Sequence, residues 1–209
     1  MPDLVTPAFR ALAAARDARA FHPRGRWFRG TVTATYDPAL PVPVGESEVV
    51  GRLSKGIGTP GGLPDVLGLA FRLPGPWDVL LSTSFARVLP RLARNWSSGP
   101  YGSITPFRRR GRLVWLAAVP DRCRTRSAAL DALPDELGFT LEVSGPWRPV
   151  GRLVVRPLDV DRDLPVLDPV RNRPPDVDLA PAVLAKARER AYQGSRRGRS
   201  PDPVTAPDA

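Results

Sequence analysis

Short runs of β-branched, aromatic and aliphatic residues, separated by turn residues, most strongly limit how this 209-residue chain can fold. Such side chains suit the pleated, half-buried surface of a β-strand. Because short connections separate most of these runs, the pattern favours an antiparallel barrel or sandwich over repeated βαβ units. We expect strands at residues 31–36, 47–54, 66–73, 77–81, 112–119, 139–144 and 150–155.

Four segments have the composition of helices. Residues 5–20 are rich in alanine, and residues 181–192 are strong helix formers followed by Gly194. Shorter helices are expected at 85–95 and 125–137. The chain therefore combines expected helices with expected strands, which is the α+β class.

The remaining segments are expected to be irregular. Residues 21–30 are rich in turn formers, and residues 156–180 contain many prolines and aspartates. The last residues, 201–209, are polar and proline-rich, which is typical of a disordered tail. The sequence therefore predicts one domain over residues 1–200 and a disordered tail over 201–209.

Several functional classes are limited by what the sequence lacks. It has no run of eighteen apolar residues and no signal-peptide pattern at the N-terminus, so we expect a soluble cytoplasmic protein without a membrane partner. Cys123 is the single cysteine and His22 the single histidine. An internal disulfide, a cysteine-based zinc site and a site built on several histidines are therefore excluded within one chain.

The formal net charge of +10 suggests anionic partners. Nearly all basic residues are arginines, with Lys55 and Lys186 as the exceptions. Arginine binds phosphates and carboxylates with the same planar fork. The charge therefore leaves nucleic acid open as a partner, alongside carboxylate ligands such as the propionates of a haem.

Arg188 and Tyr192 lie one turn apart on one face of the expected C-terminal helix. A neighbouring guanidinium and a ferric ion both favour the phenolate form of tyrosine. Tyrosinate is an established axial ligand of haem iron.

The segment Arg-x-x-x-Tyr, followed by Ser195, Arg197 and Arg199, resembles the proximal haem-ligand helix of the catalase family. Further segments resemble that family in its own order along the chain, over about residues 19 to 199. They are the segment from Arg19 through His22 to Gly25, Val50-Gly51-Arg52-Leu53-Ser54, residues 65–73, Trp77-Asp78-Val79-Leu80, Tyr101-Gly102-Ser103, residues 149–154, and Asp168-Pro169 with Asn172 and Pro174-Pro175.

The resemblance implies a very short catalase-like protein, an antiparallel β-barrel with flanking helices that holds a ferric haem b. It implies that Tyr192 binds the iron and that His22, oriented by Ser54, moves a proton between the oxygens of a peroxide substrate. It further implies the residues that surround the cofactor: Arg188 at the phenolate, Arg19, Arg52 and Arg199 at the propionates, and Phe71 and Phe85 as candidate pocket walls.

Ser82 is the main departure from the family pattern, because catalases carry at about this place an asparagine that polarises peroxide. A hydroxyl has a shorter reach than a carboxamide. We therefore expect a haem-dependent oxidoreductase that is more peroxidase-like than a true catalase and that uses hydrogen peroxide or organic hydroperoxides.

Two alternatives remain open. One is a catalase fold without haem chemistry, such as a phosphodiesterase-type hydrolase with His22 and arginines facing a phosphate. The other is a basic module in which Arg108–Arg112 and Ser195–Arg199 bind nucleic acid or another ligand. The oligomeric state is open as well, with a homodimer as one alternative.

The segment Lys55–Gly62 contains Gly-x-Gly-x-x-Gly after an expected strand, as in dinucleotide-binding sites. Pro60 and Pro64 prevent the helix that such a site requires. A flexible loop between barrel strands is therefore the preferred interpretation.

Overall fold

The computed structural model describes residues 24–39, 42–75, 77–121, 125–159, 167–169 and 171–180. Within these ranges the regular elements are all strands. They are β1 Arg24–Ala34, β2 Gly45–Lys55, β3 Leu67–Leu73, β4 Trp77–Phe85, β5 Leu89–Pro90, β6 Tyr101–Gly102, β7 Phe107–Arg109, β8 Arg112–Val114, β9 Leu116–Pro120, β10 Leu137–Val143, β11 Arg148–Pro157 and β12 Val177–Leu179.

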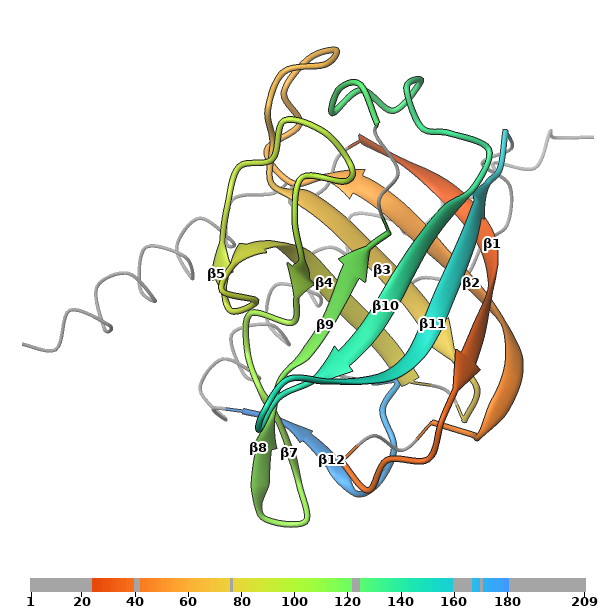
Figure 1. Cartoon of the computed structure of the whole chain (residues 1–209), viewed down its shortest axis with the longest axis vertical. Helices are drawn as coiled ribbons and strands as arrows, with labels where there is room; N and C mark the ends of the chain where they lie inside the picture. Colours follow the sequence, from red (N-terminus) through yellow and green to blue (C-terminus); the bar gives the residue numbers. More distant parts are fainter. Residues whose placement is uncertain are drawn as a thin grey trace, which may run out of the picture.

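Eight of these strands form a closed antiparallel barrel, which confirms the barrel part of the expected α+β fold (Figure 1). The strand order is β3-β2-β1-β11-β10-β9-β6-β4, and the pairing of β3 with β4 closes the ring. Closure pairs both edges of every strand in the ring, which removes the exposed edges at which sheets aggregate. The short strand β5 pairs with β4 alone, and β12, β7 and β8 form a separate sheet at one end of the barrel.

The barrel interior is filled by the side chains of alternate residues along each strand. In β10 the burial pattern alternates strictly, so that Phe139 and Leu141 are buried and their neighbours are half-exposed. Phe139 packs edge-to-face against Tyr101, with the ring centroids 5.6 Å apart. Each aromatic or aliphatic side chain buried in this way stabilises the fold by about 1.5–3 kcal/mol.

Most of the expected strands are confirmed, with different boundaries. The segments 47–54, 66–73, 139–144 and 150–155 correspond to β2, β3, β10 and β11. The segment 77–81 continues to Phe85, and 112–119 is divided at Trp115 into β8 and β9.

The prediction of turns over residues 21–30 is wrong for the described part, because β1 begins at Arg24. Five of the seven residues from 24 to 30 are arginine or glycine, which are not among the strand formers. Their backbone is nevertheless paired with β2 along its whole length, and tertiary pairing of this kind overrides local propensity.

Two helix predictions are wrong. At 85–95, Ala86 and Arg87 adopt positive φ angles of 48° and 66°, which reverse the chain between β4 and β5. At 125–137 the chain forms turns, and the hydroxyl of Thr125 accepts a hydrogen bond from the Ser97 amide at 3.1 Å instead of capping a helix. The predicted helices at 5–20 and 181–192 and the tail at 201–209 lie outside the described residues.

The glycine-rich loop after β2 is organised by two buried charged residues. The Asp65 carboxylate accepts hydrogen bonds from the amides of Ile57 and Thr59, each at 2.8 Å, and from the Thr59 hydroxyl at 2.8 Å. Lys55 donates to the carbonyl of Gly61 at 2.7 Å. Burial raises the pKa of Asp65, but these hydrogen bonds and Lys55 outweigh it, so the pKa lies below its ordinary value. The loop connects β2 to β3, as expected.

None of the residues that the structure describes belongs to a helix with the length and apolar character needed to cross a bilayer.

Candidate functional site

The outward face of β1 to β4 carries a row of very small residues. Pairing across these strands joins Gly25 to Ser54, Ser54 to Gly68, and Gly68 to Ser82. Their sequence neighbours Leu53, Leu69 and Leu81 are buried core residues, and successive side chains in a strand point to opposite faces. Gly25, Ser54, Gly68 and Ser82 are therefore aligned on the outward face. We call this set the small-residue row.

The two serines of the row come from segments that are distant in the sequence. Ser54 and Ser82 are separated by β3 alone, so they lie about 10 Å apart, the width of two strand spacings. Ser54 is buried, with 4% of its surface exposed, and Ser82 is half-buried. The barrel thus places on one face two hydroxyl groups that the resemblance assigns to one site.

The neighbouring row of outward-facing residues has larger and mostly apolar side chains. Two positions further along the strands, Trp27 pairs with Arg52, Arg52 with Ala70, and Ala70 with Leu80. All four of these residues are half-buried. The outward face therefore has a strip of small residues bordered by aliphatic and aromatic side chains and one guanidinium.

Arg52 lies across the backbone of Gly25. A Cβ atom at position 25 would be 2.7 Å from Nε of Arg52 and 2.8 Å from its Cζ, closer than real Cβ contacts. Only glycine leaves room for the guanidinium there. The Arg52 side chain therefore reaches the end of the small-residue row that β1 and β2 form.

Phe71 and Phe85, the residues predicted to wall the haem pocket, belong to neither of these two outward rows. Phe71 is fully buried in the barrel core, on the face of β3 opposite to Gly68 and Ala70. Its role is core packing, and it does not line the outward face. Phe85 ends β4 with 64% of its surface exposed.

The motif around Asp168 has a structural role that the sequence did not reveal. Asp78 is fully buried and accepts two hydrogen bonds from Arg72, from Nε at 2.6 Å and from Nη2 at 2.8 Å. It also accepts from the Asp168 amide at 2.6 Å and from Nδ2 of Asn172 at 2.8 Å. The hydrogen bond with Asp78 raises the pKa of Arg72, against the opposing effect of burial. These contacts attach the segment around 168–172 to the start of β4.

The other predicted site residues lie outside the described residues: Arg19, His22, Arg188, Tyr192 and Arg199. The structure therefore places Arg52, Ser54 and Ser82 on one face and does not describe the predicted iron ligand or the histidine. Among the residues with described positions, no three His, Cys, Asp or Glu side chains form a group that could hold a metal ion.

Solved catalases share this fold. The chain superposes on a fungal catalase with a TM-score of 0.68 and on catalase A from Saccharomyces cerevisiae with a TM-score of 0.66, each at 12% sequence identity. The superpositions cover 95% of this chain but 63% and 65% of those two chains, so it spans less than two thirds of their length. No protein-family model and no curated protein matches the sequence. The described barrel therefore has the catalase fold, and the likeness at this identity concerns the fold alone.

Proposed function

We propose that this catalase-fold chain binds haem against the outward face of β1 to β4 and reacts with peroxides in a peroxidase-like manner. The observation that carries the proposal is the register, which places Ser54 and Ser82 on either side of Gly68 in one row. The resemblance to the catalase family assigned both serines to one site, from separate segments of the chain.

The described face fits a planar, largely apolar cofactor. A macrocycle needs a flat surface, and the small-residue row has no side chain longer than that of serine. Ala70 and Leu80 supply apolar contacts beside it. Arg52 supplies a planar donor for a carboxylate at the edge, which is the chemistry that a haem propionate requires.

The remaining contacts are assigned to residues outside the described ranges. Tyr192 would bind the iron, Arg188 would favour its phenolate form, and Arg19 and Arg199 would join Arg52 at the propionates. His22 is three residues before Gly25, so covalent geometry keeps its Cα within about 11 Å of the small-residue row.

In the proposed reaction this chain's residues position the peroxide and move its proton. When bound, the haem supplies the iron at which the O–O bond is cleaved. The imidazole of His22 accepts a proton from one peroxide oxygen and returns it to the other, while the Ser54 hydroxyl orients the ring. Ser82 donates a single hydrogen bond with a short reach, which favours peroxidase-like turnover and organic hydroperoxides over the disproportionation of hydrogen peroxide.

Haem titration followed by absorbance at the Soret band tests the proposal. The full chain should take up haem at a one-to-one ratio, and Tyr192→Phe should abolish the high-spin ferric spectrum. His22→Ala should retain the spectrum and lose the reaction with peroxide.

A pair of bulky substitutions tests the location. Ser82→Leu fills the small-residue row and should block haem uptake. Thr33→Leu adds the same side chain to an exposed position at the far end of β1 and should leave uptake unchanged. A chain that stays colourless with excess haem, or equal uptake by both leucine variants, would contradict the proposal.

A further inference from the structure

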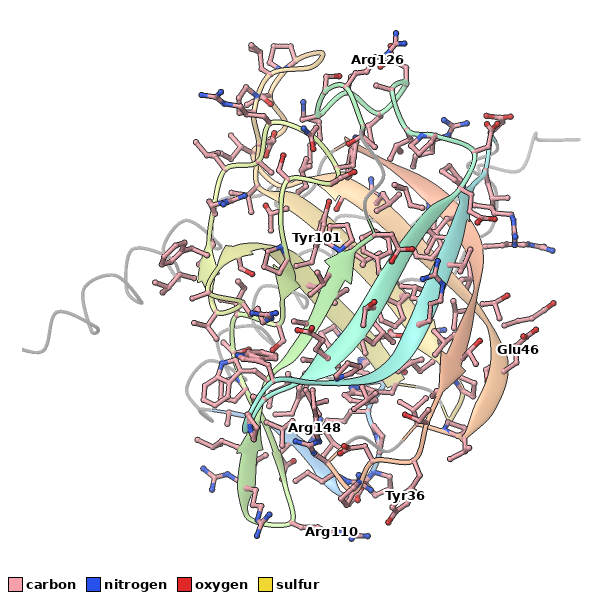
Figure 2. All side chains as sticks on the ribbon, in the orientation of Figure 1. Tyr36, Glu46, Tyr101, Arg110, Arg126 and Arg148 are labelled. Carbon is pink, nitrogen blue, oxygen red and sulfur yellow. The ribbon has the colours of Figure 1, made fainter. Side chains whose placement is uncertain are left out.

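The hairpin formed by β7 and β8 concentrates positive charge at one end of the barrel. Residues 107–114 contain Arg108, Arg109, Arg110 and Arg112 and no acidic residue. Figure 2 shows Arg110 at the tip of this hairpin, which projects beyond the barrel. We call residues 107–114 the arginine hairpin.

These arginines are poorly suited to forming a stable hairpin. Arg110 and Gly111 form its two-residue turn with φ angles of 47° and 78°, a geometry for which Asn-Gly is the preferred sequence. Arg109 and Arg112 are direct cross-strand partners, and like charges in such a pair repel each other. Local conflicts of this kind are expected where a segment is used for function.

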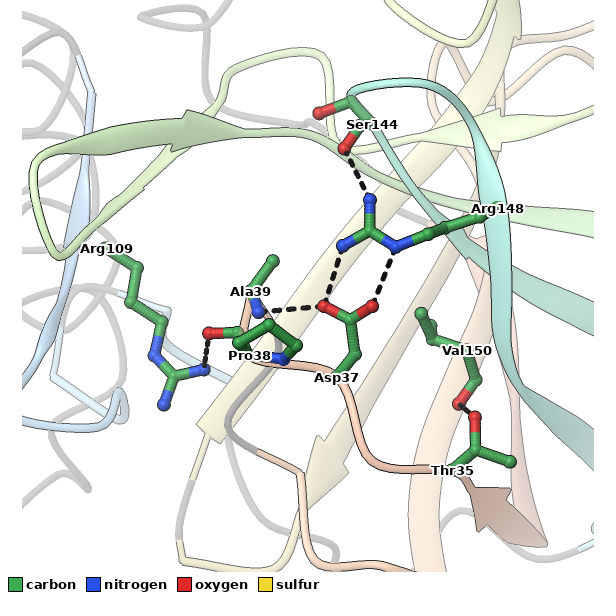
Figure 3. A network of polar contacts seen from close by, with 8 residues as sticks. All are labelled: Thr35, Asp37, Pro38, Ala39, Arg109, Ser144, Arg148 and Val150. Carbon is green, nitrogen blue, oxygen red and sulfur yellow. Dashed lines mark hydrogen bonds and ion pairs between the residues drawn. The ribbon is translucent and has the colours of Figure 1, made fainter.

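One of the four arginines fixes the hairpin to the barrel. Arg109 donates through Nη1 to the carbonyl of Pro38 at 2.7 Å (Figure 3). It also donates through Nε to the carboxylate of Asp176 at 2.8 Å. Asp37, beside Pro38, is itself held by Arg148 of β11 through two hydrogen bonds of 2.8 and 2.9 Å. The base of the arginine hairpin is therefore anchored by one ion pair, to Asp176, and by one hydrogen bond, to the Pro38 carbonyl.

The other three arginines are available to a partner. Arg108, Arg110 and Arg112 are solvent-exposed, and none of them forms an ion pair or side-chain hydrogen bond with the residues of known position. Of the nearby acids, Asp176 is paired with Arg109 and Asp178 with Arg173. The hairpin therefore presents three exposed guanidinium groups that form no ion pair within the described part of the chain. The pKa of Asp176 is lowered mainly by its hydrogen bond from Arg109, and the nearby charge of Arg110 also contributes.

We propose that the arginine hairpin binds the sugar-phosphate backbone of nucleic acid. A guanidinium forms paired hydrogen bonds with phosphate oxygens, and a two-stranded ribbon has the dimensions to enter the major groove of a DNA duplex. The net charge of +10 favours encounter with a polyanion. Tyr36, 78% exposed, lies two residues before Pro38, which the hairpin contacts, and offers a ring for stacking. An anionic membrane is less well matched, because the turn itself is Arg-Gly and the single exposed aliphatic side chain of the hairpin, Leu113, lies behind it in β8.

The test measures binding of the full chain to a labelled DNA duplex by fluorescence anisotropy at several salt concentrations. The double variant Arg110→Asn/Arg112→Gln removes two charges and places a preferred residue in the turn. The control Arg94→Gln/Arg126→Gln removes two exposed charges elsewhere.

The hairpin variant should bind roughly tenfold more weakly for each arginine at about 0.1 M salt, with a slope of log affinity against log salt that is smaller by about two. The melting temperature of the hairpin variant should be no lower than that of the wild type, and its haem uptake should be equal. A failure of this proposal can therefore be distinguished from a failure of the haem proposal. An equal loss in the control, no binding by the wild type at low salt, or tighter binding to vesicles of anionic phospholipid would overturn it.

Discussion

Replacing Asp78 with asparagine should destabilise the barrel far more than the same replacement at a surface ion pair. The fully buried Asp78 carboxylate accepts two hydrogen bonds from Arg72, one from the Asp168 amide and one from Asn172. An amide group keeps one accepting oxygen and turns a donor toward at least one of these donors. Asp78→Asn therefore loses the charge of the pair and at least one hydrogen bond.

The expected loss in the free energy of unfolding follows from the burial of the ion pair between Asp78 and Arg72. Removing one partner of a buried ion pair costs about 3–5 kcal/mol, because the remaining group loses the charge that offset its desolvation. The Arg72 side chain is 26% exposed, so water can solvate part of its charge. We expect a loss of about 3 kcal/mol, at the lower end of that range.

Urea unfolding followed by tryptophan fluorescence measures this loss. With an m-value of about 2 kcal/mol per molar urea, the midpoint should fall by about 1.5 M at an unchanged m-value. The control Asp121→Asn breaks an ion pair with Arg152, whose side chain is 54% exposed, and should cost less than about 1 kcal/mol. Equal midpoints for the two variants would refute the reasoning, because they would mean that solvent screens the Asp78 cluster as fully as a surface pair.

Two further predictions concern connections between strands. The pKa of Asp65 is lowered in the folded chain because its hydrogen bonds outweigh burial, so its contribution to stability is present above the unfolded pKa of about 3.9 and is lost as the pH falls through the lower folded value. Asp65→Asn should therefore flatten the loss of stability below about pH 4, measured by urea unfolding at each pH, and an unchanged slope would contradict this. Ala86→Asn should stabilise the β4–β5 turn by about 0.5–1 kcal/mol and raise the melting temperature by about 1–4 °C, because asparagine tolerates the positive φ of 48° better than alanine. A lower melting temperature in calorimetry would show that the side chain at position 86 has another role.

The sequence was sufficient to predict the barrel wherever the pattern of buried residues was local. Residues 139–144 alternate between buried and exposed side chains, and the strand is confirmed there. Residues 85–95 and 125–137 have good helix formers, but pairing with neighbouring strands and contacts with distant residues decide their structure. The amino-acid composition of a segment does not specify these long-range contacts.

The candidate site was predictable in its residue types and not in its arrangement. The resemblance drew attention to Arg52, Ser54 and Ser82, but their alignment depends on the register between strands, and a shift by one residue turns a side chain to the other face. The space that Gly25 leaves for Arg52 and the attachment of Asp168 and Asn172 to Asp78 likewise arise only in the folded chain. The proposed roles of His22 and Tyr192 remain predictions.

The position of β1 between β2 and β11 has a consequence for how the chain is made. During synthesis β1 can pair with β2 early. Its other edge pairs with residues 151–157, so that edge remains unpaired until more than a hundred further residues have been synthesised. Contacts this distant in sequence make folding slow, and the open edge of β1 is a template for strand addition until then. A nascent chain that terminates before β11 should therefore be prone to aggregation, whereas the finished ring hides that edge.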